Sequence, residues 1–454
     1  MAAKKILLLL SSDRFAFPLI RYLAEEGKTF GWKTRVGCMF DPGIGKRIRE
    51  ENFATEVSFI DITKFQECDQ AIRKSDIVIA QVTDNVLLQI ADSCIAYRKT
   101  LLSPARLNRQ MALKKTLAKE NNVLILMDCG FAPGLDHITA KKAIDNIRAK
   151  GGKITSFKTY SGSFIPESYH DNPWEFKFAE PVADVMTWGR HNNRHLLQGR
   201  LHHIPYHRLF ERSEQINIRD VENTIVIPEG DSLYYRKIYE LVDAHTVIKG
   251  KLARKGFDRM WDLLIRLGFT DTVSKIDLGG EGSFYSFLES LLPYSGSSNL
   301  EQRLQEYTGA DMEDIEKLKS LGLFESSWVE GYREITPAII LQCLLEKRLA
   351  PQPEDKDCVV MEHQLGYELR DEHYEFRATF ISQGENQKDS ALAKAIGLTC
   401  GAAAKAVLLG SISVKGLHIP ITRDIYDPIL NELSDLGVAF HFGDAKVEVA
   451  QPAN

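Results

Sequence analysis

Residues 7–18 read LLLLSSDRFAFP, and this stretch decides how the beginning of the chain folds. Four consecutive leucines indicate a strand that is buried on both faces, and the run from Pro18 indicates a helix. Further strand patterns lie at 34–39, 57–60, 77–80, 100–102 and 123–127, with helix-like stretches at 18–26, 64–74, 85–97 and 107–121 between them. These repeated strand–helix units predict a doubly wound parallel sheet in an α/β protein.

The bulk composition is that of an ordinary globular chain. Its 454 residues, 44% hydrophobic and 26% charged, are enough for two or three domains. A net charge of -5 argues against a nucleic-acid or membrane partner, and no apolar run approaches the ~18 residues of a membrane span. The seven cysteines are scattered without a C-x-x-C pair, which predicts reduced thiols and a cytoplasmic protein.

The loop after the first strand is where a dinucleotide-binding sheet carries G-x-G-x-x-G/A. The first glycine makes a tight turn, the second admits the pyrophosphate, and the third lets helix and strand pack closely. Ser11, Asp13 and Ala16 stand at these positions. Ala16 suits the third task, but the carboxylate of Asp13 opposes a pyrophosphate. Three alternatives follow: Asp13 caps a helix and nothing binds, which is favoured, a dinucleotide binds in an altered pose helped by Arg14, or another ligand binds.

Acidic residues also follow the other predicted strands. Asp41 comes after the second strand, where it could accept a hydrogen bond from a ribose 2′-hydroxyl. Asp61 follows the third strand and Asp84 the fourth. Together with Asp13 they would give this edge of the sheet a negative rim that repels an anion and suits a cation. The alternative is that some of them cap helices, which we favour for Asp84.

Farther along, the chain resembles a known family. The segment DCGFAPGLDH (128–137) looks like the signature of the saccharopine dehydrogenase (glutamate-forming) family, also called saccharopine reductase. The resemblance continues through AKGGKITSF (149–157), DNPWEFKF (171–178), IPYHRLF (204–210), DS (231–232), KG (249–250) and IPITRDIYD (419–427). It therefore spans nearly the whole chain.

The resemblance implies an architecture and a chemistry. It implies a Rossmann-like domain at 1–128 completed by about 390–450, an α/β substrate and dimerisation domain at 129–255 and about 356–389, and a helical subdomain at 256–355. It implies reversible hydride transfer at the secondary amine that links lysine to glutamate, with NAD or NADP as cofactor. The implied partners are a small-molecule ligand in an interdomain cleft and a second copy of the chain in a homodimer.

The chain departs from the family pattern where the family binds its cofactor. Ser11 and Asp13 replace the loop glycines. The family carries an aspartate where Ala132 stands in the signature, and Ser-Tyr where Ala105 and Arg106 follow the fifth strand. The changes at Ser11 and Asp13 point to a lost or altered cofactor site, and those at Ala132, Ala105 and Arg106 fall at substrate positions of the family.

The substrate positions of the middle domain depart as well. The family carries an arginine before Asp-Ser, where this chain has Gly230, and a threonine where it has Lys251. A tryptophan is missing near Ala179 and Glu180. The family arginine clamps a carboxylate, and glycine cannot replace a bidentate guanidinium.

Carried over by position, the family's sites fall on named residues of this chain. The cofactor site falls on Ser11, Ser12, Asp13, Arg14, Phe15, Asp41, Asp61 and Thr83. The substrate site falls on Ala105, Arg106, Ala132, Asp136, His137, Asp171, Asn172, Gly230, Lys251 and Arg254. Asp136 and His137 begin a predicted helix, either as its N-terminal cap or as part of a carboxylate site. Asp171 and Asn172 could reach the same cleft, and Arg254 either orients an anion or lies exposed.

A group of histidines offers a further candidate. His191 and His195 are spaced i, i+4, a spacing that zinc uses on a helix, and His202, His203 and His207 follow. No glutamate lies inside the pair, so we predict histidines that face solvent or make hydrogen bonds, and no metal site.

Three functions remain open from the sequence. The first is a saccharopine-type dehydrogenase with an altered cofactor loop. The second is a non-catalytic relative, a dimer that binds a small molecule or a protein. The third is an enzyme on the same scaffold with a different substrate, such as a cation. The changes at the cofactor loop and at Gly230 motivate the last two.

Overall fold

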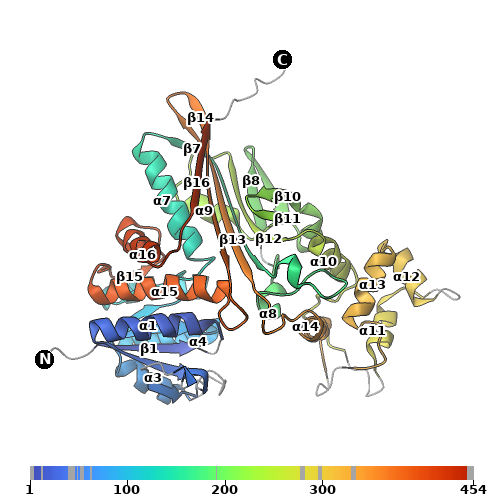
Figure 1. Ribbon diagram of the computed structural model, residues 1–454, viewed down its shortest axis with the longest axis horizontal. Coiled ribbons are helices and arrows are strands. Elements are labelled where there is room, and N and C mark those ends of the chain that lie inside the picture. The colour runs from blue at the N-terminus through green and yellow to red at the C-terminus, as the bar shows by residue number, and fades with distance from the viewer. Residues whose placement is uncertain are drawn as a thin grey trace. The chain divides into compact units, whose positions relative to one another are not determined.

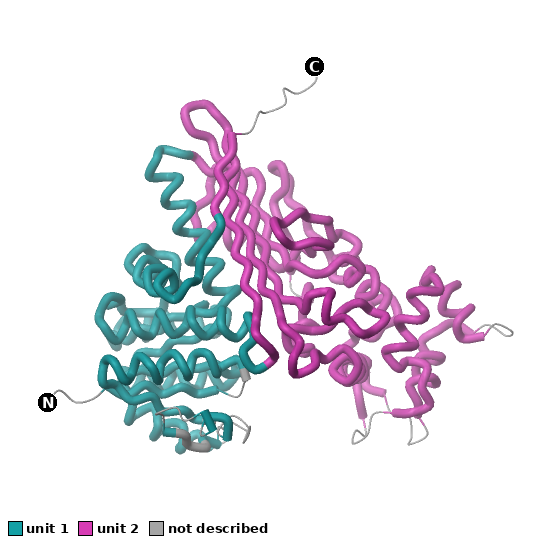
Figure 2. Tube along the Cα trace, viewed as in Figure 1, with its two compact units in different colours: residues 1–152, 388–441 teal, residues 153–387, 442–454 magenta. Residues whose placement is uncertain are grey.

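The structure is a computed structural model that describes residues 5–11, 14–38, 46–48, 50–51, 56–61, 64–190, 192–276, 282–294, 299–328 and 334–446. The chain divides into two compact units, each made of two separate stretches (Figure 2). Unit 1 contains residues 1–152 and 388–441, and unit 2 contains residues 153–387 and 442–454. Unit 1 holds a parallel sheet and unit 2 a mixed sheet, which confirms the predicted fold class.

Unit 1 is organised around a parallel sheet, for which the described ranges give seven strands (Figure 1). The strands lie in the order β15-β6-β5-β4-β1-β2-β3. They are β1 (Ile6–Ser11), β2 (Lys33–Cys38), β3 (Glu56–Phe59), β4 (Ile77–Gln81), β5 (Thr100–Leu102), β6 (Leu124–Leu126) and β15 (Gly416–His418). Leu7 to Leu10 are almost fully buried, as expected of a strand with helices on both faces.

The helices of unit 1 follow the predicted pattern with two corrections. They are α1 (Phe17–Phe30), α3 (Phe65–Arg73), α4 (Asp84–Ala96), α5 (Arg109–Ala112), α6 (Lys115–Glu120), α7 (Leu135–Ala149), α15 (Ala391–Leu409) and α16 (Arg423–Asp435). The helix predicted at 107–121 is two helices, because the N–H of Lys114 bonds to the carbonyl of Met111 and tightens the turn between them. Asp84 is not the N-cap of α4; that position belongs to Thr83.

Helix α15 lies directly against α1 because two of its glycines remove the side chains between them (Figure 1). A Cβ at Gly397 would lie 2.8 Å from the backbone nitrogen of Leu19, and one at Gly401 would lie 2.5 Å from the ring of Tyr22. Ser390 caps α15 through a hydrogen bond from the N–H of Ala393. The two glycines thus permit the close packing of α15 against α1.

Helix α15 corrects the expectation that no apolar stretch reaches the length of a membrane span. By length and composition this helix could cross a membrane, but 67% of its apolar window is buried inside the structure. Its burial against α1 accounts for its apolar character, since a helix that is hydrophobic all round is typical of a protein core.

Unit 2 is organised around a mixed sheet of nine strands in the part of the chain that the structure describes. The main path runs β10-β11-β12-β7-β13-β14-β16, and β8 and β9 branch from β12. Strands β7 and β12 are parallel, whereas β13 is antiparallel to β7 and to β14. The strands are β7 (Lys153–Phe164), β8 (Asn193–Leu197), β9 (Arg200–Ile204), β10 (Glu214–Ile218), β11 (Val221–Pro228), β12 (Thr246–Arg254), β13 (Cys358–Leu369), β14 (Glu372–Gln383) and β16 (His441–Lys446).

The helices of unit 2 are α8 (Val182–Val185), α9 (Ser232–Ile238), α10 (Phe257–Arg266), α11 (Phe284–Leu291), α12 (Leu300–Thr308), α13 (Met312–Leu321) and α14 (Pro337–Arg348). All of them except α9 contribute residues to one core that they share with the sheet. Trp261 of α10 and Leu341 of α14 lie in the same buried cluster as Ile225 of β11. Thr336 caps α14 before Pro337, because its side chain accepts a hydrogen bond from the N–H of Ile339.

The division between the units falls later in the chain than the expected boundary at residue 128. Helix α7 belongs to unit 1, where Lys142 Nζ lies 2.5 Å from Asp427 Oδ1 of α16. The hydroxyl of Tyr426 also donates to Asp145 Oδ2 at 2.7 Å. These polar contacts hold α7 against the C-terminal helix of the same unit.

Gly397→Ala should lower the free energy of unfolding by about 1–3 kcal/mol, because the new methyl group meets the backbone of α1. The direction of the change tests the contact. In a helix without such a neighbour, replacing glycine by alanine would raise the free energy of unfolding by about 1 kcal/mol. Urea unfolding monitored by circular dichroism measures the change. An unchanged or higher midpoint would contradict the close contact between the two helices.

Candidate functional site

The carboxyl ends of β1 and β4 mark the switch point of the parallel sheet in unit 1. β1 pairs with β2 on one side and with β4 on the other, and ligands of doubly wound sheets bind outside such a point. Ser11 is buried at the end of β1, in register with Gln81 of β4. Phe15 is buried in the short helical turn before α1. The predicted site residues Ser12, Asp13 and Asp41 lie outside the described residues, as does the side chain of Arg14.

The remaining predicted residues at this edge have local roles. Asp61 is half-buried after β3, and its carboxylate lies 3.6 Å from Nζ of Lys64. Thr83 is exposed, and its side chain accepts no capping hydrogen bond within the described part of α4. Asp84 stands in the first turn of α4, where a negative charge is favourable. The carboxylates of Asp61 and Asp84 thus contribute to the local structure around them.

The signature loop, residues 128–134, links β6 to α7. Gly130 and Gly134 form an isolated β-bridge that closes the loop on itself. Gly134 has φ of +144°, and a Cβ there would lie 2.1 Å from the carbonyl oxygen of Gly130. Ala132 lies between them and precedes Pro133 in a cis peptide bond. No side chain fits at Gly134, so the backbone geometry requires this part of the signature.

Asp128 ties the signature loop to two other segments. Its Oδ1 accepts a hydrogen bond from the N–H of Leu107 at 2.6 Å, and its Oδ2 lies 3.3 Å from Nε2 of His137. Its own N–H donates to the carbonyl of Ala105 at 3.1 Å. The structure thus brings the predicted residues Ala105 and His137 together around Asp128, whereas Arg106 is exposed.

Asp136 occupies the N-terminus of α7 from within the first turn. Its Oδ1 accepts hydrogen bonds from the N–H groups of Gly134 at 2.7 Å and His137 at 2.8 Å. The N-cap itself is Gly134, which has no side-chain oxygen to offer. The expected capping role therefore falls to Asp136 two residues later. Its carboxylate uses N–H groups that a substrate carboxylate would otherwise need.

Unit 2 carries a charged cluster, which we define as Glu180, Glu229, Lys249 and Lys251. The two lysines are separated by one residue on β12, so they share one face of the sheet. Lys251 Nζ lies 2.9 Å from Oε1 and 3.0 Å from Oε2 of Glu180. Lys249 Nζ lies 3.3 Å from Oε2 of Glu229. Each lysine is thus neutralised by a glutamate of the cluster.

The pair of Glu180 and Lys251 is largely withdrawn from water. Their side chains are 12% and 16% exposed. Burial raises the pKa of Glu180, and the neighbouring ammonium group of Lys251 opposes that rise. The Lys251 ammonium group also lies 5.0 Å from the ring centre of Trp188, within cation–π range. Two independent contacts therefore fix Lys251 in place.

Gly230 stands at the position of the family's arginine, next to a different guanidinium. It has φ of +66°, and a Cβ there would meet nothing within 4 Å. Arg194 reaches the following residue, with Nε 2.9 Å from Oδ1 and Nη2 2.7 Å from Oδ2 of Asp231. This bidentate pairing occupies the guanidinium of Arg194. The space around Gly230 is therefore open, and the guanidinium of Arg194 does not replace the arginine with which the family binds a carboxylate.

Arg254 does not lie with Lys251. The two residues are three positions apart on β12, so their side chains lie on opposite faces of the sheet. Arg254 Nη1 donates to the carbonyl of Glu222 at 2.7 Å and lies 3.3 Å from Oε1 of Glu167. Lys251 and Arg254, the two predicted substrate residues of β12, therefore lie in different environments on opposite faces of the sheet.

Asp171 and Asn172 stabilise their own loop. Asp171 Oδ2 lies 3.0 Å from Nζ of the buried Lys177, and that ammonium group lowers the pKa of Asp171. Asn172 Oδ1 accepts a hydrogen bond from the N–H of Trp174, and its Nδ2 donates to the carbonyl of Phe176. Both side chains thus have structural partners within the loop.

His195 lies on a strand and not on a helix, so the i, i+4 spacing does not place it for a helical metal site. His195 is on β8 and faces His202 on β9, with ring centres 5.2 Å apart in a stacked pair. Gln198 and Gly199 both have positive φ, as the tight turn of such a hairpin requires. Burial and the neighbouring His202 lower the pKa of His195. His191 lies outside the described residues.

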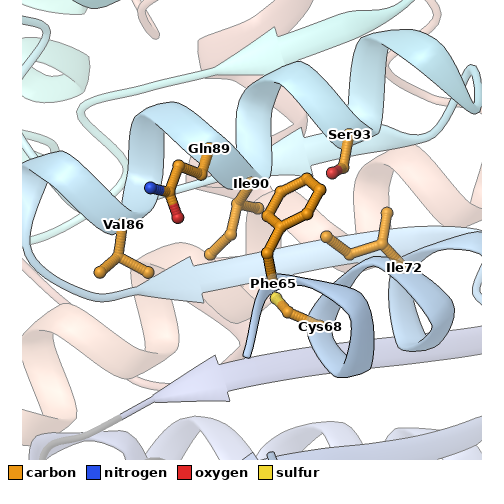
Figure 3. Close-up of a pocket in the computed structure, with 7 residues that line it drawn as sticks. All are labelled: Phe65, Cys68, Ile72, Val86, Gln89, Ile90 and Ser93. Carbon is orange, nitrogen blue, oxygen red and sulfur yellow. The ribbon is translucent and has the colours of Figure 1, made fainter. Parts of the chain in front are cut away.

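A recess between α3 and α4 is too small for a ligand. It is lined by Phe65, Cys68, Ile72, Val86, Gln89, Ile90 and Ser93 (Figure 3). Its volume of about 10 Å³ holds at most one water molecule. It is therefore part of the packing between two helices.

The strand order of unit 1 and its switch point define the dinucleotide-binding class of α/β folds. Residues 130–438 match the family described as saccharopine dehydrogenase C-terminal domain, which is more than half of the chain. The chain belongs to this family, as the sequence resemblance predicts.

Relatives with curated names agree with this assignment. The chain is 25% identical to the mitochondrial alpha-aminoadipic semialdehyde synthase of Mus musculus, over 97% of this chain and 48% of that protein. It thus spans about half the length of that relative. It is also 25% identical to the saccharopine dehydrogenase [NADP(+), L-glutamate-forming] of Pyricularia oryzae, over 95% of this chain and 97% of that protein.

A solved structure shows the same fold. The apo saccharopine dehydrogenase (L-Glu forming) of Saccharomyces cerevisiae matches with a TM-score of 0.85 at 23% identity, over 98% of this chain and 100% of that one. The comparisons thus show the family and the fold of this chain.

Sequence reasoning missed several residues of these surroundings. Glu180 stood out only as the place of a missing tryptophan, and Asp128 and Arg194 were not singled out. A signal for Glu180 was present, since both it and Lys251 are charged where the family has uncharged residues. Opposite charges at two such positions suggest a contact.

Lys251→Met should lower the free energy of unfolding by about 3–5 kcal/mol at pH 7, because it leaves Glu180 buried and without its cation. Burial raises the pKa of Glu180 above 4.5, so the native state binds this proton more readily than the unfolded chain. The loss should therefore shrink as the pH falls towards 4.5. Urea unfolding at both pH values measures it.

The matched control is Lys251→Met combined with Glu180→Gln. This variant removes both charges and should recover most of the lost stability at pH 7. A deficit that is equal at the two pH values would show that the methionine disturbs packing instead.

Proposed function

We propose that this protein is an oxidoreductase of the saccharopine dehydrogenase type that acts on a substrate other than saccharopine. The observation that carries the proposal is the contact between Glu180 and Lys251. By the family pattern a threonine stands at the position of Lys251 and a tryptophan near Ala179 and Glu180, whereas here Glu180 and Lys251 are charged and bind each other. A decaying site would leave a buried charge unpaired, at a cost of about 3–5 kcal/mol. Because the two new charges are paired with each other, they support a site that has been refitted to a different substrate.

The charges of the refitted site favour a substrate with fewer carboxylates. The charged cluster contains two lysines and two glutamates, which pair with each other. Gly230 supplies no guanidinium where the family pattern has its carboxylate clamp. Since Arg194 is held by Asp231, a glutamate-like end of a substrate would find little compensation for its charge. We therefore propose an amine substrate that lacks this dicarboxylate end.

We propose NAD or NADP as the cofactor. The switch point between β1 and β4 fits such a ligand by its topology, and the relative from Pyricularia oryzae is named for NADP(+). Residues near Ser11 and Gln81 would hold it. The nicotinamide supplies hydride acceptance or donation at the carbon next to the substrate nitrogen.

The second candidate is a non-catalytic relative that binds a small molecule or forms a homodimer. The presence of Ser11 and Asp13 where the family has glycines favours it. A buried serine at the strand end and a carboxylate in the loop would both disfavour a pyrophosphate.

A titration with NADH and NADPH separates the two candidates. The oxidoreductase should quench or enhance dinucleotide fluorescence with a micromolar Kd, and the double variant Ser11→Gly with Asp13→Gly should bind more tightly still. Absence of binding at millimolar dinucleotide would reject the oxidoreductase and leave the non-catalytic relative.

Gly230→Arg should restore affinity for saccharopine by about tenfold or more, since a charge-assisted hydrogen bond contributes about 1.5–3 kcal/mol. The matched control is Gly230→Ala, which imposes the same cost of a side chain at positive φ without a guanidinium. Calorimetric titration of both variants with saccharopine measures the difference. Equal affinities would show that this position is no longer part of the substrate site.

A further inference from the structure

A pocket of about 350 Å³ opens in unit 2 at the carboxyl ends of the parallel strands β7 and β12. Arg254 lines it, so the pocket lies on the sheet face opposite to Lys251 and the charged cluster. Its volume is in the range of small-molecule sites. The carboxyl ends of parallel strands are also where α/β sheets commonly bind ligands.

The inner wall of this pocket is apolar. Phe164, Val221 and Ile381 line it and belong to one hydrophobic cluster on this face of the sheet. Cys358 completes the wall, and burial raises the pKa of its thiol to about 11. The thiol is therefore neutral at physiological pH and contributes to an apolar surface.

Arg254 is held in this wall, but several N–H groups of its guanidinium make no hydrogen bond to the described residues. Its guanidinium lies 4.8 Å from the ring centre of Phe164, and its side chain is 12% exposed. Among the described residues only Glu222 and Glu167 accept hydrogen bonds from it, both through Nη1. Its Nε is buried without an acceptor. Burial lowers the pKa of Arg254, which fits a cation short of partners.

The mouth of the pocket has the opposite charge. The carboxylates of Glu167, Asp220 and Glu222 line it, all on exposed residues. Arg219 Nε lies 3.4 Å from Oδ2 of Asp220, so three carboxylates stand beside two guanidinium groups, and the excess of carboxylates disfavours a plain anion. A plain cation would meet the guanidinium of Arg254 at the wall. The two kinds of charge are satisfied together by a ligand that carries both.

We propose that this pocket binds a zwitterionic α-amino acid with an apolar side chain. Its carboxylate accepts hydrogen bonds from Arg254, and its ammonium group lies among the carboxylates of the mouth. Its side chain packs against Phe164 and Ile381. This site is separate from the charged cluster, so amino-acid binding here does not depend on the substrate or the cofactor of the proposed oxidoreductase.

Protection of Cys358 from alkylation tests the proposal on the full chain. The protein is treated with iodoacetamide at alkaline pH with and without millimolar L-leucine, and each cysteine is quantified by peptide mass spectrometry. L-leucine should slow the alkylation of Cys358 at least tenfold. Cys343 of α14, which is half-buried in the same unit, is the internal control and should react at an unchanged rate. Isopentylamine and isovalerate, which each carry one of the two charges, should protect much less.

Arg254→Met should abolish this protection. The matched control is Arg377→Met on β14, which lies on the same sheet face and about 20 Å from the end of the strand at Gln383. This variant should keep the protection by L-leucine.

Four outcomes would overturn the proposal. They are no protection of Cys358 by L-leucine, equal protection by the single-charge compounds, an equal slowing at Cys343, or protection that survives Arg254→Met. The result is independent of the dinucleotide titration, since a protein without cofactor binding would still protect Cys358.

Discussion

A charge withdrawn from water must meet an opposite charge, and unit 2 depends on this constraint. Lys177, which is 3% exposed, lies between Asp355 at 2.8 Å and Asp171 at 3.0 Å. Lys249 and Lys251 each meet a glutamate on one face of β12. The two lysine–glutamate pairs join loops to β12, and Lys177 joins two loops to each other. A substitution of one member therefore acts on the loop that carries the other, which couples the shape of the site to its charge.

Local patterns were enough to predict most of the fold. The opening leucines form a buried strand because their surroundings on both faces are apolar, and Thr336 caps its helix through its own hydroxyl. Prediction failed where tertiary contacts decide. The hairpin of β8 and β9, with positive φ at Gln198 and Gly199, was not predicted from the sequence. The boundary between the two units depends on contacts between α7 and α16, which are far apart in the chain. Such contacts leave no pattern in the local sequence.

The candidate site was predictable in position more than in contacts. The family resemblance located Lys251 and Gly230, but the partner of Lys251 lies 71 residues earlier in the chain. Their contact depends on how the loop before α8 folds onto the sheet, which no local pattern specifies. Asp128 was missed for a similar reason, since its carboxylate acts through the N–H of Leu107 and the ring of His137.

Because side chains alternate along β12, the two faces of this strand carry different charged groups. Lys249 and Lys251 place paired charges on one face, and Arg254 places a partly unsatisfied guanidinium on the other. Because the backbone between them is held by strands on both sides, the charges on one face can change while the other face keeps its geometry. Members of a family that share this sheet can therefore change the charges on the face of Lys249 and Lys251 by paired substitutions. The opposite face remains free to acquire a ligand of its own.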